Sequence, residues 1–371
     1  MTRTLLIVLA LGLPISELAI IREPYLRVAA QERLRIVVEE MQLPIAAYDA
    51  YGHFDPTLTI DDLLVLENGK PQEVRSVRHV PAKVILLLDT GGEVNSAKTI
   101  RTTRAIAKNL VSALNVQDEV SVLQFNDRVE LLQDWTHDFE QVSRVLDTKL
   151  LSGKRAHLSD ALIAAVIQFG ELRTLNRQLV LITDGAETPG GKFDQTEALK
   201  RLRATDIVVH VISYKAVSQE AMKDTRRILR KRDKSTTPDE VVDSLPDDPV
   251  FDQLRRLHKP GGITADVDPE RQQNVREYER AMKQSNPLLL SLTNDTGGRM
   301  WLPESLVEII ANGADAARLI DSQYILTYKP KQAVASAVEG EVRRIDVVSR
   351  RVGLIVVSRR HYLVQATHPS R

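Results

Sequence analysis

The chain has 371 residues, enough for two domains of ordinary size, and 43% of them are apolar and 27% charged, as in globular rather than fibrous or disordered proteins. Its 50 basic and 50 acidic residues give a formal net charge of zero, which argues against a nucleic-acid partner because the broad basic field is missing. There is no cysteine, which excludes disulfides, cysteine-ligated metals and a thiol nucleophile.

An apolar segment, Leu5–Leu13, lies behind Arg3 at the amino end. It is far shorter than the roughly 20 residues that span a bilayer, but it fits the apolar core of a secretory signal, which has about 7–15 residues. We therefore interpret residues 1–30 as a signal peptide or N-terminal hydrophobic segment, and expect an exported protein of the periplasm, cell surface or exterior. The best small-residue cleavage site, Val28–Ala30, follows several charged residues, so an uncleaved membrane tether stays open.

Residues 33–80 have the pattern of a small antiparallel β unit. Apolar residues partly alternate from Arg35 to Tyr48, which favours a half-buried strand. Further along, Asn68–Gly69 separates two strand-like runs, and this dipeptide is a strong hairpin signal because both of its residues accept a positive φ.

From Lys83 onward the pattern changes to strands that alternate with helices. Val84–Leu88 is continuously apolar, which is typical of a parallel strand covered on both faces. Further strands are expected at Val120–Phe125, Val129–Leu132, Leu179–Ile182, Ile207–Ile212, Met300–Leu302 and Tyr324–Tyr328. Helices are expected from Ile100 (about six turns), at Phe139–Leu146 and Leu158–Phe169, near Leu199, from Asn286 and at Glu304–Leu319. This alternation predicts a Rossmann-like, doubly wound, mostly parallel α/β sheet.

The α/β pattern, which spans residues 82–328, is interrupted at about 216–285 by a charged insertion. Its basic run, Arg226–Lys234, is followed by an acidic one, Asp239–Asp248, which favours a self-neutralising solvated surface. At the carboxyl end, residues 340–365 contain two more strand-like runs. We expect these strands to pair with the N-terminal β unit and complete a small β-rich accessory domain.

Two carboxylates follow strands of the predicted sheet. Asp89 ends the first strand and Asp184 ends the fourth. If the strand order is 3-2-1-4, the two strands are neighbours at the point where doubly wound sheets bind ligands. Two acids at that place either share a hard divalent cation or repel each other, in which case Asp184→Ala would relieve repulsion.

Four motifs resemble those of a von Willebrand factor A (vWA) domain, both in sequence and in their order and spacing along the chain. Ile85–Glu93 resembles its opening Asp-x-Ser-x-Ser segment, and Val180–Gly185 its later Thr-Asp-Gly strand end. Leu158–Leu162 is similar to its Leu-x-Asp-Ala-Leu helix, and Thr296–Arg299 to its late Thr-Gly-Gly turn. The segment Val65–Glu73 and the Arg-rich strands after the domain resemble an exported bacterial subfamily described from Acidobacteria.

The resemblance implies a metal-ion-dependent adhesion site (MIDAS), in which two aspartates, two serines and a threonine hold Mg²⁺ and a carboxylate of the partner completes the shell. Asp89 and Asp184 match the aspartates, but Gly91, Glu93 and Ala156 stand where the hydroxyl ligands belong. We therefore expect a degenerate site without a cofactor. Binding of Mg²⁺ or another divalent cation to Asp89, Glu93 and Asp184 is the less favoured alternative. Lys154 and Arg155 could neutralise the aspartates without any metal.

The function expected from this resemblance is non-enzymatic binding of another protein, of the adhesion or scaffold type. The expected contact surface comprises Thr90, Gly91, Gly92, Lys154, Arg155, Ala156, His157, Gly185, Glu187 and Thr188. No catalytic residue is predicted, since the sequence lacks a nucleotide-binding glycine loop, a His-x-x-x-His pair and a nucleophile elbow, and His210 has the setting of a hydrogen-bonded strand residue. The alternative is a metal-dependent hydrolase that uses Asp89, Glu93 and Asp184.

Overall fold

The computed structural model describes residues 40–92, 98–170, 176–219, 280, 285, 287–332 and 341–363. The chain divides into two units, Met1–Val38 and Glu39–Arg371, and the architecture below is that of the second. The N-terminal segment, the charged runs of the insertion and Glu93 lie outside the described residues. Within the described part of the chain, no helix is both long and apolar enough to cross a membrane.

The largest sheet within the described residues has six strands, in the order β10-β9-β8-β5-β6-β7. They are β5 (Lys83–Asp89), β6 (Glu119–Phe125), β7 (Val129–Thr136), β8 (Arg177–Thr183), β9 (Val208–Ser213) and β10 (Met300–Trp301). All neighbouring strands are parallel except β6 and β7, which are antiparallel. In chain order the first four strands therefore lie 3-2-1-4, and the expected doubly wound α/β fold is confirmed.

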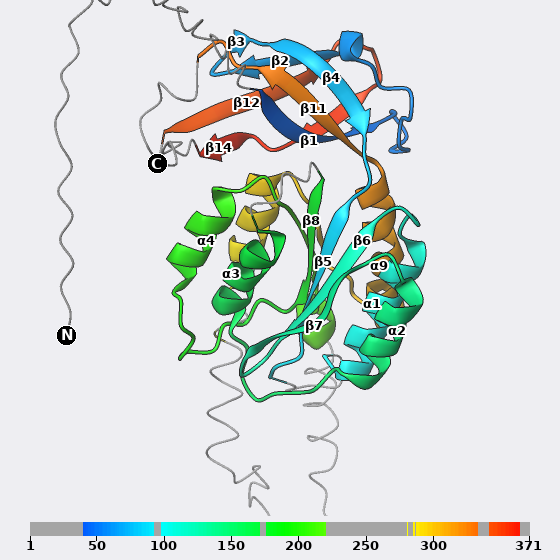
Figure 1. Cartoon of the computed structure of the whole chain (residues 1–371), viewed down its shortest axis with the longest axis vertical. Coiled ribbons are helices and arrows are strands. Elements are labelled where there is room, and N and C mark those ends of the chain that lie inside the picture. Colours follow the sequence, from blue (N-terminus) through cyan, green and yellow to red (C-terminus); the bar gives the residue numbers. More distant parts are fainter. Residues whose placement is uncertain are drawn as a thin grey trace, which may run out of the picture. The chain divides into compact units, whose positions relative to one another are not determined.

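Helices cover both faces of this sheet (Figure 1). Helices α1 (Ile100–Ala113), α2 (Phe139–Thr148) and α9 (Leu306–Asp321) lie on one face, and α3 (Leu158–Phe169) and α4 (Gln195–Arg203) on the other. Strand β5 contributes side chains to the apolar cores on both faces of the sheet. Leu86 belongs to the core that contains α1, and Leu87 belongs to the core that contains α3. Helix α1 begins at Ile100 as expected, behind its N-cap Thr99. It has 14 residues, about four turns rather than six, because the backbone becomes extended at Leu114.

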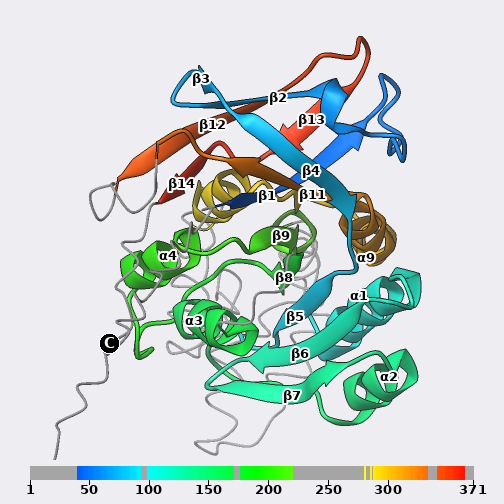
Figure 2. The same ribbon diagram turned by 45° about the horizontal axis from the view of Figure 1, so that its top comes forward.

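Strands from both ends of the described chain form two smaller sheets, seen with the helices in Figure 2. One has the order β13-β1-β11-β4 and the other β14-β12-β2-β3. The strands are β1 (Met41–Tyr48), β2 (Leu63–Glu67), β3 (Lys70–Pro71), β4 (Glu73–His79), β11 (Gln323–Lys329), β12 (Val342–Ser349), β13 (Ile355–Ser358) and β14 (His361–Leu363). Antiparallel pairing of β1 with β13 and of β2 with β12 joins N-terminal strands to C-terminal ones. We call these strands the β region.

The hairpin predicted from Asn68–Gly69 is confirmed. Strands β2 and β3 pair across it, and Asn68 and Gly69 have φ angles of 50° and 76°. These left-handed conformations are readily adopted only by residues such as Gly and Asn, which explains why this dipeptide turns the chain here.

One strand lies elsewhere than expected. The segment Tyr324–Tyr328 was predicted inside the α/β domain, but β11 pairs antiparallel with β1 and β4 of the β region. Its alternate side chains explain this placement, because Tyr324, Leu326 and Tyr328 are buried in the apolar core of the β region. Within the described residues, the α/β part therefore ends with α9.

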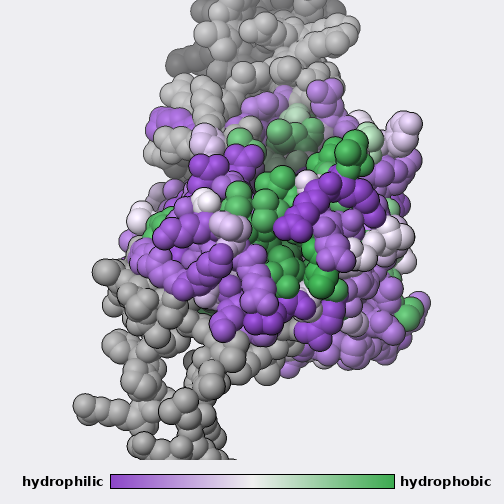
Figure 3. All heavy atoms as spheres, turned by 90° about the horizontal axis from the view of Figure 1, so that it is seen from above, coloured by the Kyte–Doolittle hydropathy of each residue, from purple (hydrophilic) through white to green (hydrophobic). Residues whose placement is uncertain are grey.

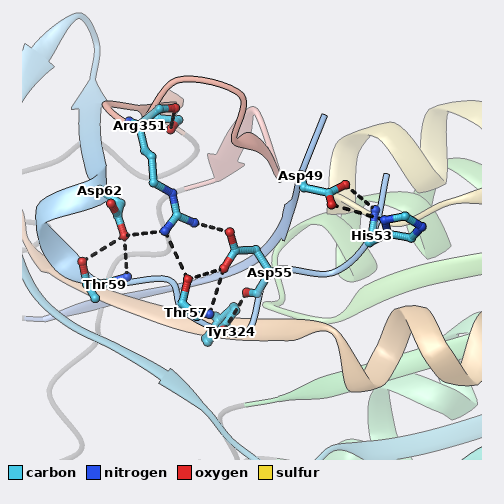
Figure 4. A network of polar contacts seen from close by, with 9 residues as sticks. Asp49, His53, Asp55, Thr57, Thr59, Asp62, Tyr324 and Arg351 are labelled. Carbon is cyan, nitrogen blue, oxygen red and sulfur yellow. Dashed lines mark hydrogen bonds and ion pairs between the residues drawn. The ribbon is translucent and has the colours of Figure 1, made fainter. Parts of the chain in front are cut away.

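A loop of the β region is held by a polar network (Figure 4). The guanidinium of Arg351 pairs with Asp55 and donates to Thr57 Oγ1 at 3.2 Å. The hydroxyl of Tyr324 donates to the Asp55 carbonyl at 2.9 Å. These contacts fasten the loop after β1 to the turn between β12 and β13.

The outer surface of the β region is partly apolar. The space-filling view from above shows a group of hydrophobic side chains surrounded by hydrophilic ones (Figure 3). The exposed large apolar residues of these strands are Val342, Val348, Ile355 and Val357. Val348 pairs in register with half-buried Leu64, so part of this apolar surface continues from β12 to β2.

A buried chain of amides connects the β region to the six-stranded sheet. His210 Nε2 donates to Gln178 Oε1 at 3.0 Å, and Gln178 Nε2 donates to Gln323 Oε1 at 2.8 Å. The Nδ1 atom of His210 accepts the N–H of Arg299 at 3.1 Å, so this ring is neutral with its proton on Nε2. The prediction that His210 is a hydrogen-bonded strand residue is thus confirmed, and burial lowers its pKa to about 3.

Candidate functional site

Asp89 and Asp184 come together at the carboxyl ends of the neighbouring parallel strands β5 and β8. Both side chains are fully buried. The N–H of Gly91 donates to Asp89 Oδ1 at 3.1 Å, and the N–H of Ala186 donates to Asp184 Oδ1 at 2.9 Å. The convergence expected from the strand order is therefore present, and backbone groups orient both carboxylates.

Lys98 supplies the cation between these two acids. Its Nζ atom lies 2.8 Å from Asp89 Oδ2 and 3.0 Å from Asp184 Oδ2, and its side chain is only 2% exposed. In the chain, Lys98 directly precedes Thr99, the N-cap of α1. We call Lys98, Asp89 and Asp184 the buried triad.

Burial and charge act in opposite directions on the groups of the triad. Burial by itself would lower the pKa of Lys98, but the carboxylates of Asp184 and Asp89 more than offset this and raise it, so the ammonium stays protonated. Burial raises the pKa of Asp89, and the charge of Lys98 opposes that rise. The triad is therefore an ion-pair cluster in which each charge depends on the others.

The described residues do not fit the metal ion that the MIDAS resemblance implies. A divalent ion shared by Asp89 and Asp184 would compete with the ammonium that already contacts one oxygen of each. At Gly91, the position of the first serine, an ideal Cβ would lie 1.7 Å from the carbonyl oxygen of Arg155, so no side chain fits there. Within the described part of the chain, no group of three or more His, Cys, Asp or Glu residues could hold a metal.

Three loops at this end of the sheet are bonded into one surface. The N–H of Gly92 donates to the Gly153 carbonyl at 3.1 Å, and the N–H of Gly153 donates to the Thr90 carbonyl at 3.0 Å. Ala156 and Thr188 exchange two hydrogen bonds, of 2.8 and 3.0 Å. The loops that follow β5 and β8 are thus both fastened to the segment before α3.

The expected contact surface is only partly accessible. Lys154 and Arg155 are exposed, and Gly92, Glu187 and Thr188 are half-buried. The remaining members are buried, namely Thr90, Gly91, Ala156, His157 and Gly185. Of these buried members, Thr90 and Ala156 take part in the hydrogen bonds that join the loops.

The source of the neutralising charge also differs from the expectation. Lys154 and Arg155 were the cations that the sequence suggested as able to neutralise the aspartates, but both residues are exposed and the acids pair with Lys98. A signal for Lys98 was present, because it is the only basic residue between Asp89 and Ile100. The sequence analysis did not consider Lys98, although it lies close in sequence to Asp89 and to Gly91, which has no hydroxyl group.

Glu187 has a local role in this surface. One of its carboxylate oxygens accepts the N–H and the hydroxyl of Ser159 at 2.9 and 3.0 Å, at the first turn of α3. Burial raises its pKa, and the two bonds from Ser159 oppose that rise. Ser159 therefore donates to a carboxylate, which is a structural arrangement and not that of an activated nucleophile.

The six-stranded sheet is doubly wound, and its two buried acids lie at the point where the strand order reverses. Residues 84–187 match the family described as von Willebrand factor type A domain. The match supports a vWA domain within residues 84–187, and the topology of the six-stranded sheet agrees with it. No curated protein matches the sequence.

Solved structures are similar at low identity. A von Willebrand factor type A protein from Catenulispora acidiphila is 8% identical, with 84% of this chain and 74% of that one covered and a TM-score of 0.41. The conserved hypothetical protein BatB from Bacteroides thetaiotaomicron is 21% identical over 35% of this chain and 65% of that one, with a TM-score of 0.30. The vWF domain of the type V pili tip protein Mfa5 from Porphyromonas gingivalis is 16% identical over 32% of this chain, with a TM-score of 0.27.

This chain spans less than two thirds of BatB and 44% of the Mfa5 domain. All three TM-scores lie below 0.5, so the assignment depends on the family match and on the strand order.

Proposed function

We propose that this chain is a non-enzymatic, protein-binding vWA protein of the adhesion or scaffold type, with a degenerate MIDAS that takes no part in metal-mediated binding. The observation that carries the proposal is the ammonium of Lys98 between Asp89 and Asp184. A partner carboxylate that binds through Mg²⁺ in an intact MIDAS would meet, among the described residues, an ammonium in contact with both aspartates instead. Binding then relies on the exposed and half-buried residues of the three joined loops, chiefly Lys154, Arg155 and Glu187.

The same proposal includes the location of the protein, its subfamily, its accessory domain and the class of its partner. The apolar segment at Leu5–Leu13 supports export, with either cleavage or a membrane tether, and the flanking segments support kinship with the Acidobacteria-type exported subfamily. The pairing of β1 with β13 and of β2 with β12 supports a β accessory domain built from residues 33–80 and 340–365. The neutral net charge supports a protein partner rather than a nucleic acid.

A metal-dependent hydrolase is the rival function, and the triad disfavours it. Such an enzyme needs a Lewis-acidic ion with an open position for water or substrate. Both aspartates on which it would depend are engaged by Lys98, and the serine position at Gly91 has no room for a ligand.

The test is capture of a partner by the full chain from an envelope extract of the encoding organism, in excess EDTA and in excess Mg²⁺. We expect the same protein to be retained in both buffers and lost with the variant Lys154→Ala/Arg155→Ala. The matched control is Lys70→Ala/Lys331→Ala, which removes two exposed lysines of the β region and should retain the partner. Retention only in Mg²⁺, or equal loss in both variants, would contradict the proposal.

A further inference from the structure

Two fully buried carboxylates need a compensating charge. Asp89 and Asp184 are removed from water at one end of the sheet, where each accepts one N–H from its own loop. Asp89 also accepts the hydroxyl of Thr183 at 2.6 Å. Such bonds reduce the cost of burying one carboxylate, but they do not cancel the repulsion between two ionised ones.

We propose that Lys98 is a built-in replacement for the metal ion, so that the chain itself supplies the cation that joins the ends of β5 and β8 and closes the site to divalent ions. The Nζ atom contacts one oxygen of each aspartate at nearly equal distances, 2.8 and 3.0 Å, as a shared cation would. Because it is covalently attached, this cation is present at every metal concentration.

The surroundings of Lys98 fit a permanent cation rather than an accidental contact. Its side chain is 2% exposed, so the charge is held without water as an alternative partner. The cap of α1 at Thr99 fixes the backbone beside it. The loop over the site has also closed, since the Arg155 carbonyl fills the space that a side chain at position 91 would need.

The replacement of a metal ion by Lys98 would change the electrostatic interaction with a partner carboxylate from attraction to repulsion. Two aspartates and one ammonium carry more formal negative than positive charge. The triad thus repels a partner carboxylate, whereas a metal would attract it. This inference deepens the degenerate-site part of the proposed function, and it does not depend on whether a partner is found.

The first test is thermal unfolding of the full chain in EDTA and in millimolar Mg²⁺, Mn²⁺ or Ca²⁺. We expect the same Tm in all four buffers, since a ligand that binds the folded state would raise it. A metal-dependent rise in the Tm of the unaltered protein would overturn the proposal, and this arm needs no variant to fold.

The second test removes the charge and keeps the volume. Lys98→Met should lower the Tm by about 10 °C, because it leaves two buried carboxylates without their cation. The matched control is Lys108→Met on α1, which removes an exposed ion pair with Asp147 and should change the Tm by about 2 °C or less. Equal stability of the two variants would overturn the proposal.

The third test removes the Lys98 side chain from between the two aspartates. Lys98→Ala should acquire a Tm that rises with Mn²⁺, because the vacated space lies between two carboxylates. Lys98→Ala/Asp184→Asn should lose that response. A folded Lys98→Ala protein that ignores Mn²⁺ would contradict the claim that the ammonium stands in the place of a metal. None of these measurements involves a partner, so their outcome is separate from that of the capture experiment.

Discussion

The two regions of the molecule each contain a buried ion-pair cluster, and the clusters are built differently. In the β region, Arg343 is fully buried and its Nη1 atom lies 2.7 Å from Glu67 Oε1. The hydroxyl of Tyr328 donates to the other oxygen of Glu67 at 2.9 Å. In the α/β region, Lys98 pairs with two carboxylates that are both fully buried.

The difference lies in the balance of charge and in the elements that carry it. Glu67 and Arg343 belong to the paired strands β2 and β12, and the second acid of Arg343, Glu341, is 27% exposed. That cluster is balanced inside the core and is explained by strand pairing alone. The buried triad has an extra carboxylate and lies where two strands run into loops, which is the position of a ligand site rather than of a structural bridge.

The largest effect is expected from breaking the balanced cluster. Arg343→Met should destabilise the fold by about 3–5 kcal/mol, because Glu67 would stay buried without its cation. The measurement is urea-induced unfolding at neutral pH. As a control, Arg344→Met on the same strand removes an exposed guanidinium paired with Asp346 and should cost about 1 kcal/mol or less. A similar loss for both variants would mean that burial at Arg343 does not matter.

A smaller loss is expected from removing one acid of the triad. From the sequence, Asp184→Ala was expected not to destabilise the fold severely if the site is empty, because it would relieve repulsion. The contacts favour the opposite outcome, because the change removes a carboxylate that pairs with Lys98 and the acceptor of the Ala186 N–H. We expect a cost of about 2–3 kcal/mol by urea unfolding, since Asp89 still pairs with the ammonium.

The control for that variant is Asp147→Ala, whose exposed carboxylate pairs with Lys108 and which should cost about 1 kcal/mol or less. A gain of stability in Asp184→Ala would restore the interpretation of two repelling acids and argue against the triad.

The junction between the regions predicts a dependence on pH. The pKa of His210 is about 3 in the folded protein, against 6.5 for a free histidine. The unfolded chain therefore binds a proton that the folded one excludes, and the stability contributed by His210 is present above pH 6.5 and lost as the pH falls towards 3. The expected loss is about 1 kcal/mol over the first pH unit below the unfolded value.

The measurement is the free energy of unfolding between the unfolded pKa of histidine and one unit below it. His210→Asn should be less stable at neutral pH but should show a shallower slope, since the substituted residue does not titrate. An unchanged slope in this variant would assign the pH dependence to other groups.

The smallest effect is expected at the surface of the β region. Arg351→Ala removes a guanidinium that is about one-third exposed and pairs with Asp55. Because solvent screens this pair, the expected cost is about 0.5–1 kcal/mol in urea unfolding. A loss as large as that of Arg343→Met would erase the distinction between exposed and buried pairs on which the comparison depends.

Much of the fold could be predicted because its signals are local. The continuous apolar run of β5 and the helical spacing after it are set by neighbouring residues, and short connections then restrict the strand order. The convergence of Asp89 and Asp184 followed from that order. The Asn68–Gly69 hairpin was equally local, because it depends on the φ angles that two adjacent residues accept.

Other features depended on contacts between distant parts of the chain. The periodicity of Tyr324–Tyr328 indicates a strand, but not that β11 pairs with β1 and β4. Likewise, the types of Thr90 and His157 do not reveal that loop-to-loop hydrogen bonds bury them.

The sequence by itself determined the alternation of strands and helices and the absence of hydroxyl side chains at positions 91, 93 and 156, while the strand order 3-2-1-4 was a condition that the structure fulfils. Only the tertiary structure decided which cation compensates the two acids. Lys154, Arg155 and Lys98 carry the same charge, and their position in the sequence does not say which of them reaches the space between the strand ends. The choice of Lys98 depends on where α1 begins and on how closely the loop at Arg155 packs over Gly91, and both are set by packing in three dimensions.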